Sequence, residues 1–565
     1  MSNTTSLVES KDEISNSSAG AVSSELLATT MGDQKMISAE QQETSEDEKN
    51  HLPFGFKLVM IIVGLMFGVF CVALDNTIIA VAIPRITDQF HNLTDVGWYG
   101  SSYLLTTCAF QLPFGKIYSI TSVKWTFLAA LGLFEIGSLI CAVAPSSTVL
   151  IVGRAIAGLG SAGIFTGGLL VLAHVVALEQ RPIYFGLIGG VYGVASVCGP
   201  LLGGVFTDKV SWRWCFYINL PLGAITTVLV VFFLKLEPRP KAAKVSWMIS
   251  VKRLDPLGNL LFLPSIICLL LALQWGGVTY AWSDGRIIGL FIVFGITLIA
   301  WGFLEVKLGD DATVPSRIAS QRSIAFASLF GLGIGGSFFI YIYFIPIWFQ
   351  AILGTSAVRA GIDSLPLILA EILAIVVSGG LVTKFGYYAP FFIASSVVMS
   401  IGAGLMTLFT VDISQARWVG FQFLYGIGVG FGFQQGGVAA QTVLKFADVS
   451  IGTAVVLFWQ ILGGAIFVSV AQNLFTNKLV KDLLALGIPG LDPVIIVHAG
   501  ATNLRAVVPE AALPAVLFAY NKAILKTFQL GLILSCISIL GAVGIEWRSV
   551  KAPLEKAEEV GSVEV

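Results

Sequence analysis

Two ionisable residues lie in segments that are otherwise apolar and long enough to cross a membrane. Asp75 occurs in the run Leu74–Pro84, and Arg154 occurs in Gly153–Gly160. A carboxylate at membrane depth costs several kcal/mol unless it is paired, hydrated or protonated, and a guanidinium cannot lose its proton. We predict that Asp75 binds a proton or acts in gating, with capping of a neighbouring helix as the alternative. We predict that Arg154 tunes a nearby carboxylate, with a charge that snorkels to the cytoplasmic side as the alternative.

Two further carboxylates, those of Glu135 and Glu371, are surrounded by apolar residues in the sequence. Intramembrane carboxylates are by default candidates for proton or ion pathways, so each is a candidate for titration during a transport cycle. The alternative for both is a hydrogen bond between helices.

The segment from Gly189 to Gly204 is rich in glycine and contains one proline. Its glycines would let neighbouring backbones approach closely, and the proline would bend the helix. Such a helix, packed against the opposite half of the protein, suits a rocking interface, and ordinary close packing is the alternative. The residues predicted for this interface, including those of the following turn and helix start, are Gly193, Gly199, Pro200, Gly203, Gly204, Arg213 and Asn219.

A substrate cavity would need polar and aromatic side chains between the helices. Gln111, Gln350 and Gln434 are candidates for the polar contacts, and Phe338 and Trp348 for aromatic walls. Aromatic residues in spans more often face lipid or the core, which is the alternative for the last two.

Enzyme chemistry is not indicated by the sequence. It has no nucleophile with a matching base, no metal-ligand spacing among its seven cysteines and no Gly-rich Lys-Ser/Thr motif for nucleotides. We therefore expect no catalytic residues, no metal and no cofactor, and an ion gradient as the source of energy.

Membrane helices must position these residues, because the composition is that of a membrane protein. Of 565 residues, 56% are hydrophobic and 12% are charged, whereas a soluble domain has about 25% charged residues. The net charge of −1 argues against a nucleic-acid partner. Since a span needs roughly 20 apolar residues, the apolar stretches predict an all-α fold with fourteen transmembrane helices, at 57–82, 98–117, 124–144, 149–173, 183–207, 215–235, 256–275, 286–305, 322–345, 361–381, 388–410, 416–441, 451–475 and 524–545.

Lysine and arginine are more frequent in the loops on one side of these spans, about fourteen against six. That side is predicted to be cytoplasmic, with both termini in the cytosol. The predicted parts are a disordered tail (1–55), a six-helix half (56–236), a linker with inserted helices 7 and 8 (237–306), a second six-helix half (307–546) with an outside loop at about 476–523, and a cytoplasmic tail (547–565). Asn92 begins a glycosylation sequon on the outer side, but it lies close to a span, so we favour no glycan there.

The two halves contain an internal repeat. Such repeats build a substrate site near the bilayer midplane between the halves. The matching elements are Gly115–Ser122 with Gly379–Gly386, and Gly153, Arg154, Gly158 and Gly160 with Gln422, Gly426 and Gly428.

These motifs resemble those of the major facilitator superfamily, in particular its fourteen-helix drug:proton antiporter family. Leu74–Pro84 is similar to the helix 1 motif, and Gly153–Gly160 to the helix 4 motif, whose Arg is assigned to proton coupling. The glycines and proline of Gly193–Gly204 resemble the helix 5 motif of exporters, and Trp212–Pro221 resembles the fourteen-helix branch. The likeness covers roughly residues 55–545.

Within this family the sequence most resembles the fungal toxin-efflux group, through Gly115–Tyr118, Lys124 with Trp125, and Phe134–Cys141. One position departs from the superfamily pattern. The loop after helix 2 usually has an Asp four residues past its Gly, and here Ser119 stands there, which argues against a charge-relay latch in this loop.

The resemblance implies a proton-coupled exporter of small organic compounds such as toxins, secondary metabolites or drugs, working by alternating access. We expect a monomer in the lipid bilayer, in the plasma membrane or alternatively in a vacuolar membrane. Two other functions stay open: import, or transport of siderophores or basic amino acids, and a receptor or scaffold that has lost transport.

Overall fold

The structure of the chain is a computed structural model. It describes residues 53, 55–90, 95–236, 253–277, 279–488, 492–493, 495–496, 504–505 and 507–551, and the regular elements of these residues are helices. Most of both predicted tails, the sequon at Asn92 and most of the linker before the inserted pair lie outside the described residues.

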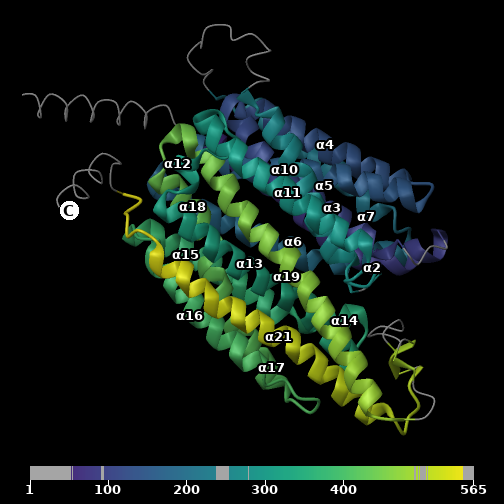
Figure 1. The fold of residues 1–565 in the computed structure, drawn as a ribbon. Coiled ribbons are helices and arrows are strands. Elements are labelled where there is room, and N and C mark those ends of the chain that lie inside the picture. The colour runs from purple at the N-terminus through teal and green to yellow at the C-terminus, as the bar shows by residue number, and fades with distance from the viewer. Residues whose placement is uncertain are drawn as a thin grey trace, which may run out of the picture. The chain divides into compact units, whose positions relative to one another are not determined.

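The first half of the protein contains six long helical segments, and the inserted pair follows them (Figure 1). The first half consists of α2 (Phe56–Phe90), α3 (Val96–Ile120), α4 (Val123–Val143), α5 (Ser147–Val175), η1 (Leu178–Gln180), α6 (Arg181–Lys209), α7 (Trp214–Tyr217) and α8 (Asn219–Phe233). The inserted pair is α10 (Pro256–Trp275) and α11 (Gly285–Leu308).

The second half repeats this plan with more short helices between the long ones. It consists of η2 (Gly309–Asp311), α12 (Ser316–Ala319), α13 (Arg322–Ile352), α14 (Ala357–Asp363), α15 (Leu365–Phe385), α16 (Ala389–Met406), α17 (Gln415–Gly432), α18 (Gln435–Val443), η3 (Phe446–Asp448), α19 (Val449–Ala485) and α21 (Leu513–Gly544).

A helix lies at each of the fourteen ranges predicted to span a membrane. Twelve of the described helical segments are long and apolar enough to do so; α3 and α17 are not among them. The polar residues that lower their hydropathy are turned inward, since Gln111 of α3 and Gln422 of α17 are fully buried. The helical membrane fold is therefore confirmed, and the count of fourteen spans stays a prediction.

The outside loop predicted at about 476–523 is partly helical, and its place outside the membrane stays a prediction. The helix α19 continues to Ala485, and α21 begins at Leu513. The ion pair between Lys478 and Asp482, at 2.7 Å, supports the extra turns of α19, and Leu479 on the same helix is buried. Charges spaced four residues apart lowered the hydropathy of this stretch without ending the helix.

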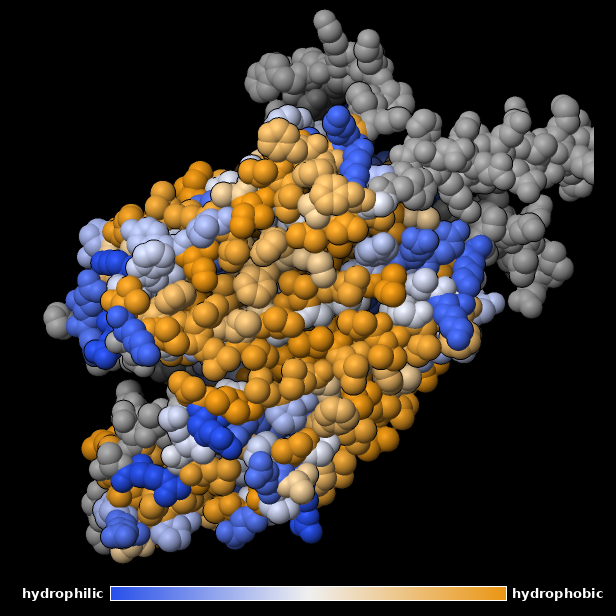
Figure 2. All heavy atoms as spheres, turned by 180° about the vertical axis from the view of Figure 1, so that it is seen from behind, coloured by the Kyte–Doolittle hydropathy of each residue, from blue (hydrophilic) through white to orange (hydrophobic). Residues whose placement is uncertain are grey.

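A broad apolar surface covers the face of the protein that Figure 2 shows, and polar residues gather toward the two ends of that face. The helix α11 is the most exposed of the candidate spans, because only 6% of the residues in its most apolar stretch are buried. Large apolar side chains such as Ile299 and Phe303 are exposed on it. Exposed apolar surface on this scale is what lipid requires and water does not tolerate.

The two halves meet along two pairs of helices, α3 with α19 and α6 with α15. At the first seam a methyl group on Gly115 would overlap Ala454. At the second, a methyl group on Gly379 would overlap the carbonyl of Pro182. The inserted helix α10 lies over the α3–α19 seam, where Phe262 packs on Phe458 with ring centroids 5.5 Å apart.

We call the end of the bundle where α3 ends and α6 begins the Lys116 end. Both halves are joined there by hydrogen bonds through one side chain. Gln441 Nε2 donates to the carbonyl of Leu169 (3.1 Å), and Arg181 Nη1 donates to Gln441 Oε1 (3.3 Å). His174 and Phe446 add a ring contact between the halves at 4.8 Å. The halves are thus closed against each other at the Lys116 end.

The internal repeat predicted from the sequence has a structural counterpart in the packing of α5 and α17. A methyl group on Gly158 of α5 would overlap the carbonyl of Tyr103 in α3, and one on Gly426 of α17 would overlap the carbonyl of Leu367 in α15. In both halves, therefore, the fourth helix touches the backbone of the second through a glycine at the same position of the repeat.

The residues after α21 are tied to the start of α13. Glu546 accepts hydrogen bonds from Gln321 Nε2 and Ser323 Oγ, both at 2.7 Å, and Arg548 Nη2 lies 3.4 Å from its other oxygen. Burial favours the neutral acid, but the hydrogen bond from Ser323 and the charge of Arg548 outweigh burial and lower the pKa of Glu546. This carboxylate lies outside the membrane-spanning helices and stabilises the chain in its ionised form.

Candidate functional site

Asp75 and Arg154 form an ion pair inside the first half. Arg154 Nη1 donates to Asp75 Oδ2, and both side chains have an exposed fraction of 0%. Arg154 is seven residues from the start of α5, so it lies about 10 Å along the helix from that end. The start of α5 is the end remote from Lys116, and the guanidinium reaches no surface, so the snorkelling alternative for Arg154 is wrong.

A second bond to the carboxylate comes from the start of α8. Asn219 Nδ2 donates to Asp75 Oδ1 (3.0 Å) and lies 3.1 Å from Ser138 Oγ of α4. All three side chains are fully buried. Helices α2, α5 and α8 are therefore joined through one carboxylate, each of whose oxygens has a different donor, and α4 is attached to it through Asn219.

The guanidinium is held in place by α3. Arg154 Nε donates to the carbonyl of Tyr99 (2.8 Å), and its central carbon lies 4.4 Å from the ring centroid of Tyr103. The face of an aromatic ring attracts a cation. Arg154 Nη2 has no hydrogen-bond acceptor among the described residues. The guanidinium thus keeps one donor free while it binds the carboxylate with another.

The sequence did not indicate the supporting residues Ser138, Tyr99 and Tyr103. Each is a polar group within a predicted span. The pattern of the chain could have given Ser138, because it lies three residues after Glu135 and therefore on the same face of α4. Tyr99 acts through its backbone carbonyl, which every residue has, so no sequence signal could have shown it.

Glu135 lies one turn from Ser138 on α4 and packs against α8. A methyl group on Gly223 would overlap its carboxylate, and Gly223 is one turn after Asn219. Neither carboxylate oxygen of Glu135 has a hydrogen-bond partner among the described residues. The hydrogen bond between helices that was the alternative for Glu135 is therefore not present. An unpaired carboxylate at this depth is expected to be protonated.

Glu371 lies in the other half of the protein, on α15, and has an exposed fraction of 6%. Its backbone carbonyl packs on α17, where a methyl group on Gly430 would overlap it. It does not belong to the Asp75 cluster. Proton binding by Glu371 stays a prediction.

The predicted interface helix, α6, contacts both halves. On one side a methyl group on Gly193 would overlap Ile372 of α15, so this glycine faces the second half. Pro200 and Gly204 face α14 of the second half. Pro200 Cβ would lie 3.9 Å from a methyl group added to the facing glycine of α14, and a methyl group on Gly204 would lie 3.8 Å from a side chain of α14. These three residues lie where movement between the halves would be felt.

Gly199 and Gly203 point the other way. A methyl group on Gly199 would overlap Thr77 Oγ1, and one on Gly203 would lie 2.9 Å from the carbonyl of Ile78, both in α2. They therefore pack within the first half, and the predicted contact with the opposite half is wrong for these two. A helix presents residues six positions apart to different neighbours, which the sequence motif alone does not resolve.

Arg213 has a structural position beside this cluster. Its Nη1 donates to the carbonyls of Ala142 (3.3 Å) and Ala144 (3.0 Å), at the end of α4, and its guanidinium lies over Trp212 at 4.4 Å. It is not bonded to Asp75. Arg213 therefore fixes the turn that presents Asn219.

Of the predicted cavity residues, Gln434 lies at the boundary between the halves, and Phe338 packs on the residue before it. Phe338 packs on Phe433 with ring centroids 5.2 Å apart. The next residue, Gln434, reaches the first half, where a methyl group on Gly189 would lie 2.9 Å from its Nε2. This Nε2 is buried and has no acceptor among the described residues. A contact between Gln434 and a substrate stays a prediction.

The other three cavity candidates are occupied by contacts inside one half. Trp348 is fully buried and its Nε1 donates to Asn521 Oδ1 (2.7 Å). Gln111 donates to Thr166 Oγ1 (2.5 Å), and Gln350 donates to the carbonyl at position 346 in its own helix (3.3 Å). Trp348 is a core residue, so its prediction as a cavity wall is wrong for this conformation.

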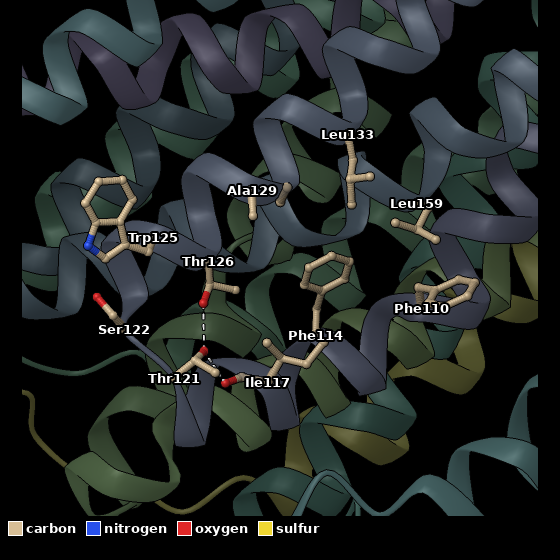
Figure 3. Close-up of a pocket in the computed structure, with 11 residues that line it drawn as sticks. Phe110, Phe114, Ile117, Thr121, Ser122, Trp125, Thr126, Ala129, Leu133 and Leu159 are labelled. Carbon is tan, nitrogen blue, oxygen red and sulfur yellow. Dashed lines mark hydrogen bonds between the residues drawn. The ribbon is translucent and has the colours of Figure 1, made fainter. Parts of the chain in front are cut away.

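A groove of about 500 Å³ lies between α3 and α4, and none of the predicted site residues lines it (Figure 3). Its mouth includes Trp125, which is 66% exposed, and its floor includes Leu159 of α5. Thr121 and Thr126 form a hydrogen-bonded pair (2.7 Å) at one end. The groove opens on the apolar outer surface of the first half, not between the halves. Its lining is Phe110, Phe114, Ile117, Thr121, Ser122, Trp125, Thr126, Ala129, Ala130, Leu133 and Leu159.

The sequence model of the Major Facilitator Superfamily matches residues 65–468, from α2 to α19. The chain belongs to the Major Facilitator Superfamily. The matched range contains Asp75, Arg154, Asn219 and the whole of α6.

Similar fungal members of the superfamily are named as efflux pumps. The chain is 62% identical over 501 residues to the efflux pump aflT of Aspergillus parasiticus, covering 88% of this chain and 97% of the relative. It is 52% identical over 524 residues to the MFS-type efflux pump MFS1 of Arthroderma benhamiae, covering 92% and 97%. The chain is accordingly an efflux transporter of the fungal toxin-efflux group, and not an enzyme.

Solved structures of the superfamily share the fold. The human organic anion transporter MFSD10 is 11% identical, with a TM-score of 0.54, covering 85% of this chain and all of the other. The proton:xylose symporter XylE is 15% identical with the same TM-score, covering 89% and 98%. At these identities the likeness supports the fold alone.

Proposed function

We propose that this superfamily member is a proton-coupled antiporter, which exports small organic compounds such as toxins or secondary metabolites by alternating access. The observation that carries the proposal is the fully buried ion pair of Asp75 and Arg154, with Asn219 on the second carboxylate oxygen. A buried charge pair is weak evidence for stability, so a role in the transport cycle is the better reason for it.

The chemistry follows from the donors around the carboxylate. Arg154 cannot give up its proton, so an incoming proton and the guanidinium compete for Asp75 Oδ2. Protonation would remove the negative charge and release the guanidinium, whose Nη2 already lacks an acceptor among the described residues. Because α2, α5 and α8 meet at this carboxylate, the exchange would alter how these three helices are held together. A preference of a few kcal/mol for one state is enough to shift the population substantially.

Proton coupling also needs a route for the proton. Glu135 is the candidate for this route, because it lies one turn of α4 from Ser138, which is bonded to Asn219 beside Asp75. Its carboxylate has no hydrogen-bond partner among the described residues. Glu371 would be a second site in the other half. We assign the primary role to Asp75 and an auxiliary role to Glu135.

The export direction and the substrate class are supported by the relatives named as efflux pumps. The placement in the membrane follows the distribution of basic residues: the Lys116 end would be cytoplasmic, with both termini on that side. The protein would act as a monomer in the plasma membrane, without a cofactor. The structure would then represent a conformation closed toward the cytoplasm.

The test is transport by purified protein in proteoliposomes. An imposed pH gradient is expected to drive uptake of a fluorescent apolar dye by the wild-type protein and not by Asp75→Asn or Arg154→Ala. Asp482→Asn is the matched control, because Asp482 also pairs with a basic residue, Lys478, but at the far end of α19. Uptake that ignores the pH gradient would refute proton coupling. Failure of wild-type protein with a broad panel that includes toxins would favour the scaffold.

A further inference from the structure

The first residues of the second half, between α11 of the inserted pair and α13, cross the Lys116 end of the bundle and connect the inserted pair to the long helices of that half. This connecting segment comprises residues 309–317 and contains η2 and the start of α12. Ala312 and Thr313 in its middle are buried, with exposed fractions of 0% and 1%. A nine-residue surface loop would not be expected to bury its centre, so the contacts that hold it require an explanation.

Two carboxylates of the inserted pair anchor the connecting segment. Asp255, at the start of α10, accepts from the backbone nitrogen (3.1 Å) and the hydroxyl (2.8 Å) of Thr313. Glu305, near the end of α11, accepts from the nitrogen of Val314 (2.8 Å). Asp255 has a left-handed backbone, with φ 51°, a conformation that costs energy for a residue other than glycine. These bonds fix the segment to α10 and α11.

The first half reaches the connecting segment through Lys116 of α3. Its Nζ donates to the carbonyls of Ala312 (2.6 Å) and Asp310 (3.4 Å). Lys116 is 4% exposed, and a buried ammonium needs acceptors because leaving water is costly. The segment supplies them.

The second half holds the other end of the connecting segment. The guanidinium of Arg317 makes two hydrogen bonds to the carboxylate of Asp448, at 2.5 and 2.9 Å, and its Nε binds Asp310 at 2.6 Å. Asp448 ends η3 and precedes α19. The two acidic partners raise the pKa of Arg317, so the guanidinium is charged at any working pH.

We propose that the connecting segment is a lock between the halves, in which Lys116 of the first half and Asp448 of the second bind the same nine residues when the Lys116 end is closed. The proposal deepens the transport function above, since it assigns residues that favour one state of the alternating-access cycle. Residues 309–317 would be held constantly by α10 and α11. Opening the Lys116 end would then require the contact with Lys116, the contact with Asp448, or both to break.

The geometry of the α3–α19 seam gives the reason that release is needed. Gly115, next to Lys116, packs against Ala454 of α19 so closely that a methyl group would overlap it. Asp448 is at the beginning of that helix, six residues before Ala454. Separating α3 from α19 therefore pulls Lys116 away from a segment fastened to Asp448.

This arrangement also accounts for Ser119, which stands where the superfamily pattern has an Asp. Its hydroxyl donates to the carbonyl of Lys116 in the same helix (2.8 Å). Lys116 supplies the positive charge of the contact between the halves, and backbone carbonyls of the connecting segment accept its hydrogen bonds. The inserted pair, absent from twelve-helix members, would thereby take part in the transport cycle.

The experiment measures the opening of the Lys116 end directly, by electron-spin distance measurements between labels on cysteines placed at the exposed positions Ser122 and Ala447. The background is a full-length chain in which the seven native cysteines are replaced. With Lys116→Gln, the ratio of long to short distances is expected to rise roughly tenfold or more, as for the loss of a charged hydrogen bond. Lys116→Arg should restore the short distance.

The matched control is Lys124→Gln. Lys124 lies at the same end and also donates to two carbonyls, those of Val231 (2.8 Å) and Leu234 (2.7 Å), but both belong to its own half. Its distances should equal those of the unmodified background. Equal distributions for Lys116→Gln and Lys124→Gln would overturn the proposal. If Lys116→Gln does not fold, Asp448→Asn tests the other attachment, with the same expected shift.

The measurement separates this inference from the proposed transport function. It uses protein without substrate or pH gradient, so an increase in long distances would support the lock even if proteoliposomes showed no transport. Conversely, gradient-driven transport with unchanged distances in Lys116→Gln and Asp448→Asn would leave the antiporter intact and refute the lock.

Discussion

Replacing Asp75 by asparagine would leave the buried guanidinium of Arg154 without its counter-charge. Removing one partner of a buried ion pair costs about 3–5 kcal/mol, because the other charge stays buried and uncompensated. Arg154 would keep the carbonyl of Tyr99 at 2.8 Å and the ring of Tyr103 at 4.4 Å. These remaining contacts place the expected cost of Asp75→Asn near the lower limit, at about 3 kcal/mol.

The reverse change, Arg154→Gln, would leave the carboxylate of Asp75 with the amide of Asn219 alone (3.0 Å). We expect about 3–5 kcal/mol here as well. The double variant Asp75→Asn/Arg154→Gln contains no buried charge, and two amides can bond to each other. It should therefore be more stable than the sum of the single variants predicts, with a coupling of about 2–3 kcal/mol.

The assay is a double-mutant cycle on protein in detergent, with the free energy of unfolding read from denaturant titrations, together with gradient-driven dye uptake. The double variant should regain stability without regaining proton-coupled transport. As a control, Lys124→Gln removes a basic residue that is bonded to the carbonyls of Val231 and Leu234 instead, so it should combine additively with Asp75→Asn. Single costs that add to within about 0.5 kcal/mol for Asp75 and Arg154 would refute the reasoning.

Three further predictions concern other parts of the molecule. Gly199→Ala would force a methyl group into Thr77 and should cost about 1–3 kcal/mol of stability, whereas Gly132→Ala meets nothing within 4 Å and should not lower the unfolding midpoint, because alanine also favours the helix; equal midpoints of the two variants would contradict the packing. Glu135→Gln should unfold like wild type but shift the pH profile of dye transport, and an unchanged profile would remove Glu135 from the proton route. The lowered pKa of Glu546 means that its stabilisation is present above the unfolded-state value of about 4.3 and is lost as the pH falls through the folded value. Glu546→Gln should thus cost about 1 kcal/mol at pH 7 and less at pH 4, as measured by unfolding at both; the same cost at both would refute this.

The positions of the helices could be predicted from the sequence, because a helix that crosses a membrane needs a stretch of roughly 20 apolar residues. The predicted boundaries failed where polar residues continue a helix, as with Lys478 and Asp482 on α19, since hydropathy does not register an ion pair one turn apart. Fourteen spans could be expected but not established this way, because α3 and α17 bury their polar residues and so have low hydropathy.

The candidate site was predictable in part. Asp75 and Arg154 stood out as charges in apolar runs, and the structure pairs them with Asn219. That these three meet depends on how α2, α5 and α8 pack, which periodicity does not specify. Trp348 looked like a cavity wall because aromatic side chains line both cavities and cores, and only its hydrogen bond to Asn521 shows that it belongs to the core.

The matching positions of Arg154 and Gln422 show how the two copies of the internal repeat differ. Arg154 donates to the carbonyl of Tyr99, and Gln422 donates to the carbonyl of Asp363 (3.1 Å). In each half the donor lies on the fourth helix, and the acceptor lies four residues before the backbone carbonyl that a glycine of the fourth helix contacts. The bond to the backbone is thus common to both copies and needs no charge. Only the first copy adds a cation, and with it the means to sense a proton. Under the proposed function the second half does not need to bind the proton. Its inner surface can therefore vary with the substrate, while the ion pair of Asp75 and Arg154 in the first half is retained.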